Sequence, residues 1–98
     1  MPDMQTFRKE IDSLDEELIK ALARRFDIVR QVAAYKSRAG VAVMQPDRIQ
    51  QIKDRCTDLG GRYGVRPEFL HQLYDLIIEE SCFLEHELVR PPEQGSGG

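Results

Sequence analysis

Residues 7–38 read FRKEIDSLDEELIKALARRFDIVRQVAAYKSR and contain neither proline nor glycine. Apolar side chains recur along this stretch at alternating steps of three and four, which is the spacing of one face of an α-helix. The members of this stripe are Phe7, Ile11, Leu14, Leu18, Ala21, Ile28, Val32 and Tyr35. The pattern predicts one helix from Phe7 to about Arg38, roughly 30 residues and about 45–50 Å long.

Such a helix is too long for the rest of the molecule to cover. The chain has 98 residues, which is enough for a single domain. A compact globule of this length has a radius of gyration of about 13 Å, so the helix would protrude from a monomer. A second copy of the chain is the economical cover for the apolar stripe, and we therefore expect a homodimer.

A second, shorter helix is expected after a loop. Gly40 is suited to closing the first helix, and residues 39–46 form the predicted loop. The second helix begins near Pro46 or Asp47, because proline and an acidic residue are both favourable in a first helical turn. Its apolar stripe consists of Ile49, Ile52, Cys56 and Leu59, and the pair Gly60–Gly61 is expected to end it.

The third helix is expected to start at Pro67 and to run to about Val89, before two consecutive prolines stop it. Its apolar face consists of Phe69, Leu70, Leu73, Ile77, Leu84 and Leu88. No stretch of the chain alternates as a strand would, so the prediction is an all-α fold of three helices: long, short, long. Residues 1–90 would form this helical domain and residues 91–98 a flexible C-terminal tail.

Composition excludes several classes of function. The net charge of −3 argues against nucleic acid or an anionic membrane surface as a partner. The two cysteines have no metal-like or redox spacing and are expected to be reduced thiols of a cytoplasmic protein. The two histidines have no partner at ligand spacing, so neither a metal nor another cofactor is expected.

Arg25 and Lys36 are cations on the apolar face of the first helix. Eleven residues separate them, which returns the chain to within roughly 20° of the same face and about 16 Å along the axis. The gap between the two side chains suits a small molecule with two anionic groups. On periodicity alone the favoured explanation is that Arg25 pairs with an acid such as Glu80 while Lys36 reaches solvent at the helix end, because buried ion pairs are commoner than ligand sites.

Four other polar residues are candidates only in combination. Arg8 lies seventeen residues before Arg25, about 25 Å along the helix, so it could share a site with Arg25 only from a second subunit. It could equally form a surface pair with Asp12. Arg48 is unusual because a helix N-terminus disfavours cations. Ser81 and Glu85 lie one turn apart on the third helix.

Taken together, these residues resemble the all-α chorismate mutases. The run from Arg8 to Asp15, followed by Leu18, Leu22, Arg25 and Lys36, is similar to the first helix of that family, and residues 76–81 (LIIEES) are similar to its third helix. The resemblance covers about residues 5–89. It implies an intertwined homodimer with two equivalent sites for a small dicarboxylate, each receiving Arg8 from one subunit and the remaining residues from the other.

The resemblance also implies a role for each residue. Arg8 and Arg25 would bind the two carboxylates, Arg48 would orient the ligand, and Lys36 and Glu85 would contact the ether oxygen, with Ser81 beside them. The reaction is a [3,3] sigmatropic rearrangement, which needs no nucleophile, base or cofactor. The enzyme must hold a near-attack conformer and stabilise negative charge on the ether oxygen.

Two departures from the family pattern bear on the substrate. Family members that act on chorismate usually carry glutamine where Glu85 stands, and a carboxyl group donates a hydrogen bond only when protonated. They usually carry a glutamate that binds the C4 hydroxyl group where Ile49 stands. The segments 35–48 and 73–78, with Cys82, are most similar to the 4-amino-4-deoxychorismate mutases of antibiotic pathways, with Gln45, Asp47 and Ile49 as candidate contacts around the C4 amine.

The leading hypothesis is therefore rearrangement of 4-amino-4-deoxychorismate to 4-amino-4-deoxyprephenate, with Lys36, Glu85 and Arg25 as catalytic residues. Two alternatives keep the same fold: a chorismate mutase that forms prephenate, and an isochorismate pyruvate-lyase, in which an apolar residue also tends to follow the arginine. A fourth hypothesis is a non-catalytic helical module that uses the long stripe only to dimerise.

Overall fold

The computed structural model describes residues 1 and 3–88, and over this part of the chain it contains three helices and no strand. They are α1 (Met4–Ala39), α2 (Pro46–Arg62) and α3 (Pro67–Leu88). The predicted all-α order of long, short and long helices is confirmed. The expected tail, residues 91–98, and the expected end of the third helix at Val89 lie outside the described residues.

α1 begins earlier than the apolar pattern predicted. Asp3 caps the helix, because its side-chain oxygen accepts a hydrogen bond from the backbone N–H of Thr6 at 3.0 Å. Gly40 ends the helix as expected: its φ of 70° is left-handed, and its N–H donates to the carbonyl oxygen of Lys36. At 36 residues, α1 is about 54 Å long.

The prediction that Gly60–Gly61 would end α2 is wrong, since the helix continues to Arg62. Gly60 is buried, and a Cβ atom at this position would clash with the side chain of Leu70 on α3. The glycine therefore permits close packing of two helices. The chain turns after Arg62, where Gly64 adopts a positive φ of 75°.

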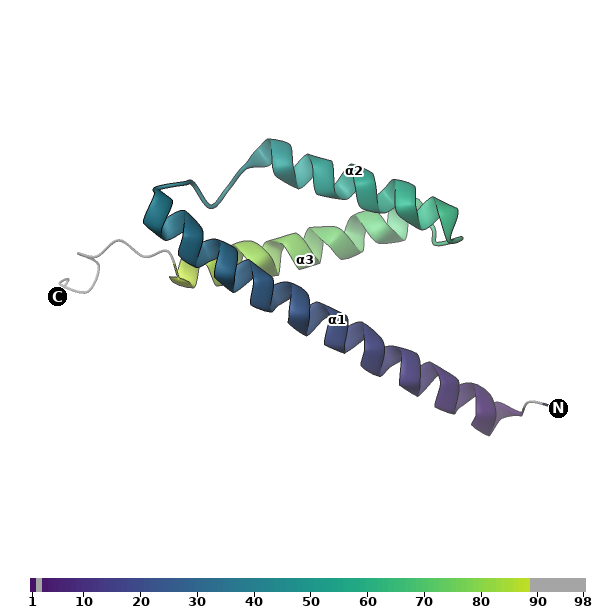
Figure 1. Ribbon diagram of the computed structural model, residues 1–98. Coiled ribbons are helices and arrows are strands. Elements are labelled where there is room, and N and C mark those ends of the chain that lie inside the picture. Colours follow the sequence, from purple (N-terminus) through teal and green to yellow (C-terminus); the bar gives the residue numbers. More distant parts are fainter. Residues whose placement is uncertain (2, 89–98) are drawn as a thin grey trace.

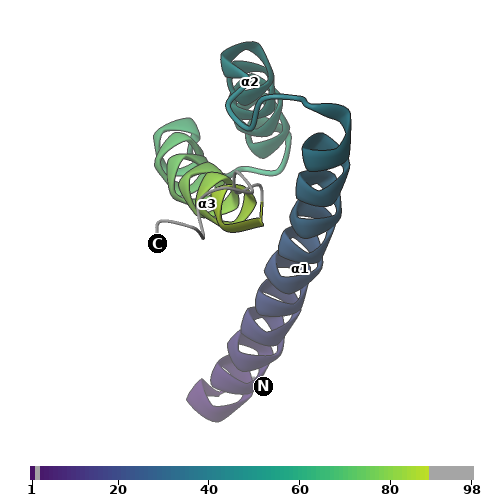
Figure 2. The ribbon, with the colours of Figure 1, turned by 90° about the vertical axis from the view of Figure 1, so that its left-hand side faces the viewer.

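α3 packs against both other helices, whereas α1 and α2 have no Cα atoms within 8 Å of each other among the described residues. Figures 1 and 2 show α2 and α3 as a hairpin that lies along the C-terminal half of α1. The N-terminal half of α1 extends away from both (Figure 1). The radius of gyration is accordingly 17.9 Å, compared with about 13 Å for a compact chain of this length.

The core is small and partly polar. Its buried apolar residues are Ala33, Cys56, Ile77 and Ile78, and two polar residues, Ser81 and Glu85, are buried with them. The predicted apolar face of α3 is only partly correct, because Phe69 and Leu88 remain about half exposed. Within the part of the chain that the structure describes, no helix is both long enough and apolar enough to cross a membrane.

Candidate active site

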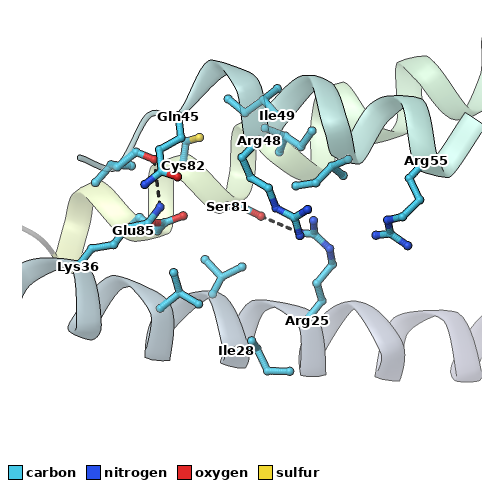
Figure 3. Close-up of a pocket in the computed structure, with 15 residues that line it drawn as sticks. Arg25, Ile28, Lys36, Gln45, Arg48, Ile49, Arg55, Ser81, Cys82 and Glu85 are labelled. Carbon is cyan, nitrogen blue, oxygen red and sulfur yellow. Dashed lines mark hydrogen bonds and ion pairs between the residues drawn. The ribbon is translucent and has the colours of Figure 1, made fainter. Parts of the chain in front are cut away.

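A cavity of about 460 Å³ lies where α1, α2 and α3 face one another (Figure 3). Its walls combine aliphatic side chains with four cations and one acid. Seven of the residues predicted as site residues line it: Arg25, Lys36, Gln45, Arg48, Ile49, Ser81 and Glu85. The spacing of Arg25 and Lys36 and the family resemblance together therefore identified seven of the fifteen lining residues.

Arg25 is held in place by α3. Its Nη1 donates a hydrogen bond to Ser81 Oγ at 2.9 Å, and Ser81 Oγ in turn donates to the carbonyl oxygen of Ile77 at 2.8 Å. The guanidinium also lies over the ring of Tyr74, 5.9 Å from its centre. Among the described residues Arg25 forms no ion pair with Glu80, so the explanation that periodicity favoured for this cation is wrong.

Lys36 is directed into the protein and not toward solvent at the helix end. Its Nζ lies 2.8 Å from Glu85 Oε1 and donates to the carbonyl oxygen of Val43 at 3.1 Å. The two charged side chains are only 13% and 10% exposed. Glu85 Oε1 is buried, and the ion pair with Lys36 compensates its charge although no contact among the described residues meets hydrogen-bond geometry.

The start of α2 supplies a third part of the wall. Arg48 donates to Gln51 Oε1 at 2.6 Å, and its guanidinium points toward Arg25 (Figure 3). Gln45 precedes the helix and donates from Nε2 to the carbonyl oxygen of Ala42 at 3.2 Å. Ile49 lies one turn after Gln45 and gives this side of the cavity an apolar surface.

Two predicted site residues do not reach the cavity. Asp47 lines a neighbouring surface hollow with Pro46 and Gln51. Arg8 is exposed on the half of α1 that extends away, seventeen residues and about 25 Å from Arg25. Among the described residues Arg8 forms no ion pair with Asp12 either. A single chain therefore does not bring Arg8 to the site.

Eight of the fifteen lining residues were not predicted as site residues; six are aliphatic and the other two are Arg55 and Cys82. Arg55 follows Arg48 by seven residues, about two helical turns, and this spacing was the available signal that both face the cavity. Cys82 lines the wall beside Glu85, and its Sγ lies 3.5 Å from Met44 Sδ. Burial, together with the nearby Glu85 carboxylate, raises the pKa of the Cys82 thiol, so its neutral form contributes to the wall.

The charges define the chemistry that this cavity can support. Three guanidinium groups and an ammonium face one acid, an arrangement that binds a small polyanion and stabilises negative charge developing on it. Within residues 1 and 3–88, no three His, Cys, Asp or Glu side chains come together as a metal site requires. The aliphatic wall residues, among them Val32, Ile52 and Ile78, suit a carbocyclic body between the charged groups.

Residues 7–86 match the model of the family described as chorismate mutase type II. The chain therefore belongs to this family of isomerases, which confirms the resemblance based on its cations and helices. The hypothesis of a non-catalytic helical module is set aside by this membership.

The chain is 42% identical over 83 residues to the 4-amino-4-deoxychorismate mutase of Streptomyces venezuelae, an alignment covering 85% of this chain and 81% of that protein. It is 36% identical over 86 residues to the protein of the same name from Streptomyces pristinaespiralis, covering 88% and 67%. The chorismate mutase of Methanocaldococcus jannaschii is 28% identical over 80 residues, covering 82% and 81%.

Proposed function

We propose that this chain rearranges 4-amino-4-deoxychorismate to 4-amino-4-deoxyprephenate. The observation that carries the choice of substrate is Ile49, whose side chain lies in the cavity wall directly after Arg48. An aliphatic side chain cannot accept a hydrogen bond from a C4 hydroxyl group, and burying such a group without a partner is unfavourable. The two Streptomyces relatives carry the name of this activity, which supports the same choice.

The geometry supports a division of roles among the cations. Arg25, fixed by Ser81 and Tyr74, would bind a substrate carboxylate, and Arg48 would orient the ligand from α2. Lys36 would stabilise the negative charge that develops on the ether oxygen as the C–O bond breaks. Glu85 would contact the same region, where its Oε1 lies 2.8 Å from Lys36 Nζ. Gln45 would contact the C4 amine through its amide oxygen.

The proposed enzyme is a homodimer with shared sites. Every residue from 4 to 21 of α1 is exposed in the single chain, including the apolar residues Ile11, Leu14 and Leu18. An antiparallel second copy of α1 would cover this stripe and bring Arg8 of the partner subunit to the cavity.

A cytoplasmic location is part of the same proposal, because Cys56 and Cys82 are both free thiols.

Turnover of the purified protein with 4-amino-4-deoxychorismate, chorismate and isochorismate in parallel tests the proposal. We expect the highest kcat/KM with the amino substrate. Faster consumption of chorismate would make the protein a chorismate mutase, and release of pyruvate from isochorismate would make it a lyase. Either result overturns the proposed substrate.

The variant Ile49→Glu sharpens the same experiment. A carboxylate at this position can accept a hydrogen bond from the C4 hydroxyl group. The kcat/KM for chorismate should therefore rise by about 10-fold or more relative to that for the amino substrate. The matched control is Ile52→Glu, which places the same charge on the same wall three residues further along α2. An equal change in this ratio of kcat/KM values in both variants would mean that the side chain at position 49 does not contact the C4 substituent.

A further inference from the structure

Arg55 lines the same cavity as Arg25 but has no role in the reaction described above. It lies on α2, and its side chain points toward α1 at the end of the cavity where Arg25 lies (Figure 3). Lys36 and Glu85 occupy the opposite end (Figure 3). The two arginines therefore come from different helices and face one another across the same end of the site.

Their surroundings differ. Arg25 is held by a hydrogen bond to Ser81 and by the ring of Tyr74. Among the described residues, the Arg55 guanidinium has neither a hydrogen bond nor an ion pair. Arg55 is exposed, so its five donors are open to solvent, and an anion between the two guanidinium groups would accept hydrogen bonds from both and offset their mutual repulsion.

Among the residues that the structure describes, none at this end of the cavity supplies that anion. Burial, and next the neighbouring Cys56 thiol, raise the pKa of the Tyr74 hydroxyl, whereas the charges of Arg25 and Arg55 act to lower it. The phenol therefore stays neutral and compensates neither arginine. Glu85, the acid that lines the cavity, is already paired with Lys36 at the far end.

We propose that Arg55 binds the same substrate carboxylate as Arg25, so that one end of the site holds this carboxylate between two guanidinium groups of a single chain. A carboxylate has two oxygens and about four acceptor positions, which allows one guanidinium to approach from each side. Arg25 is fixed before binding, and Arg55 becomes ordered when the anion arrives. The proposal rests on the proposed function, in that it takes a dicarboxylate as the ligand.

The test pairs a change in the protein with a change in the ligand. Calorimetry would measure the affinity of the intact protein for a bicyclic dicarboxylate analogue of the transition state and for each of its two monomethyl esters. In the wild type, we expect esterification of either carboxylate to weaken binding by about 10- to 100-fold. In Arg55→Gln, esterification of the carboxylate that Arg55 binds should weaken binding severalfold less than it does in the wild type, because that carboxylate has already lost one partner. Esterification of the other carboxylate should weaken binding as much as in the wild type.

Two further variants separate this role from a general effect of charge. Arg55→Lys keeps the charge without the planar fork and should recover part of the affinity for the dicarboxylate. Arg62→Gln removes an exposed arginine that pairs with Asp58 on the same helix, and it should bind all three ligands as the wild type does. Thermal unfolding of each variant checks that the fold is retained.

The proposal is overturned if Arg55→Gln loses affinity equally for the dicarboxylate and both esters, since Arg55 would then act through something other than a carboxylate. It is also overturned if Arg55→Gln binds as the wild type does, or if esterification does not weaken binding to the wild type. The proposed reaction can fail while this inference stands. That is the case if the binding data assign Arg55 to one carboxylate but the wild-type protein does not turn over the amino substrate.

Discussion

The two halves of α1 have the same apolar period but opposite surroundings. Residues 4–21 are all exposed, and the described part of the chain leaves their apolar stripe uncovered. Residues 22–39 lie along α3 and include Ala33, which is 0% exposed, and the two cavity cations Arg25 and Lys36. The stripe alone does not distinguish the halves. The cations mark the half that lines the cavity, and the uncovered half is the proposed surface for a second copy.

Replacing Lys36 tests the half of α1 that forms the site. Lys36→Met keeps an unbranched side chain but removes the ammonium, and we expect kcat to fall by about 10³-fold with little change in dimerisation. The control is Lys20→Met, in the other half of the helix, where the lysine is 71% exposed and pairs with Glu16. Steady-state kinetics and analytical ultracentrifugation measure both properties.

A comparable loss of activity in Lys20→Met would contradict the division of α1 into two halves. So would dissociation of Lys36→Met into monomers with the fold intact. Because Lys36→Met leaves the buried Glu85 carboxylate without its partner, the double variant with Glu85→Gln checks that the loss does not arise from an unpaired buried charge.

Replacing Leu14 tests the uncovered half. Leu14→Glu places a charge in the exposed stripe, and the symmetry of a dimer repeats the change in both subunits. Each leucine contributes about 1.5–3 kcal/mol when buried, so the dimer dissociation constant should rise at least about 100-fold. Sedimentation over a range of concentrations measures it. Asp12→Asn, an exposed change on the opposite side of α1 from Leu14, is the control, and an unchanged dissociation constant in Leu14→Glu would remove the stripe from the interface.

Ala33 provides the matching test in the packed half. A larger side chain at this fully buried position would overpack the contact between α1 and α3, so Ala33→Leu should lower the free energy of unfolding by about 1–3 kcal/mol. Ala23→Leu, at an exposed position of the same helix, should change it little. Denaturant titrations at one protein concentration compare the two. Equal effects would mean that the packing against α3 does not define this half.

The same contrast explains how much of the molecule the sequence predicts. Three helices follow from period, proline and glycine, and the fixed spacing along a helix places Arg25 and Lys36 on one face, whereas the other predicted site residues rested on the family resemblance. Gly60 was misjudged because helix packing, which a single sequence does not display, overrides its tendency to end a helix. Arg55 was missed because its spacing of seven residues from Arg48 is the one signal the sequence offers, and many surface arginines on a helix have such a spacing. The ion pair between Lys36 and Glu85 required the approach of α1 and α3 in three dimensions.

Mixing two inactive variants tests both halves of α1 in one experiment. Arg8→Ala alters the uncovered half, and Arg25→Ala alters the half that forms the site. If each site takes Arg8 from one subunit and Arg25 from the other, a mixed dimer contains one site with both arginines and one site with neither. Random exchange makes half of the dimers mixed, so activity should recover to about a quarter of the wild-type value. Subunit exchange, followed by mass spectrometry of differently tagged chains, must be complete before the assay. Full exchange without recovery would mean that Arg8 does not serve the site of its neighbour, and the uncovered half of α1 would then contribute to association alone.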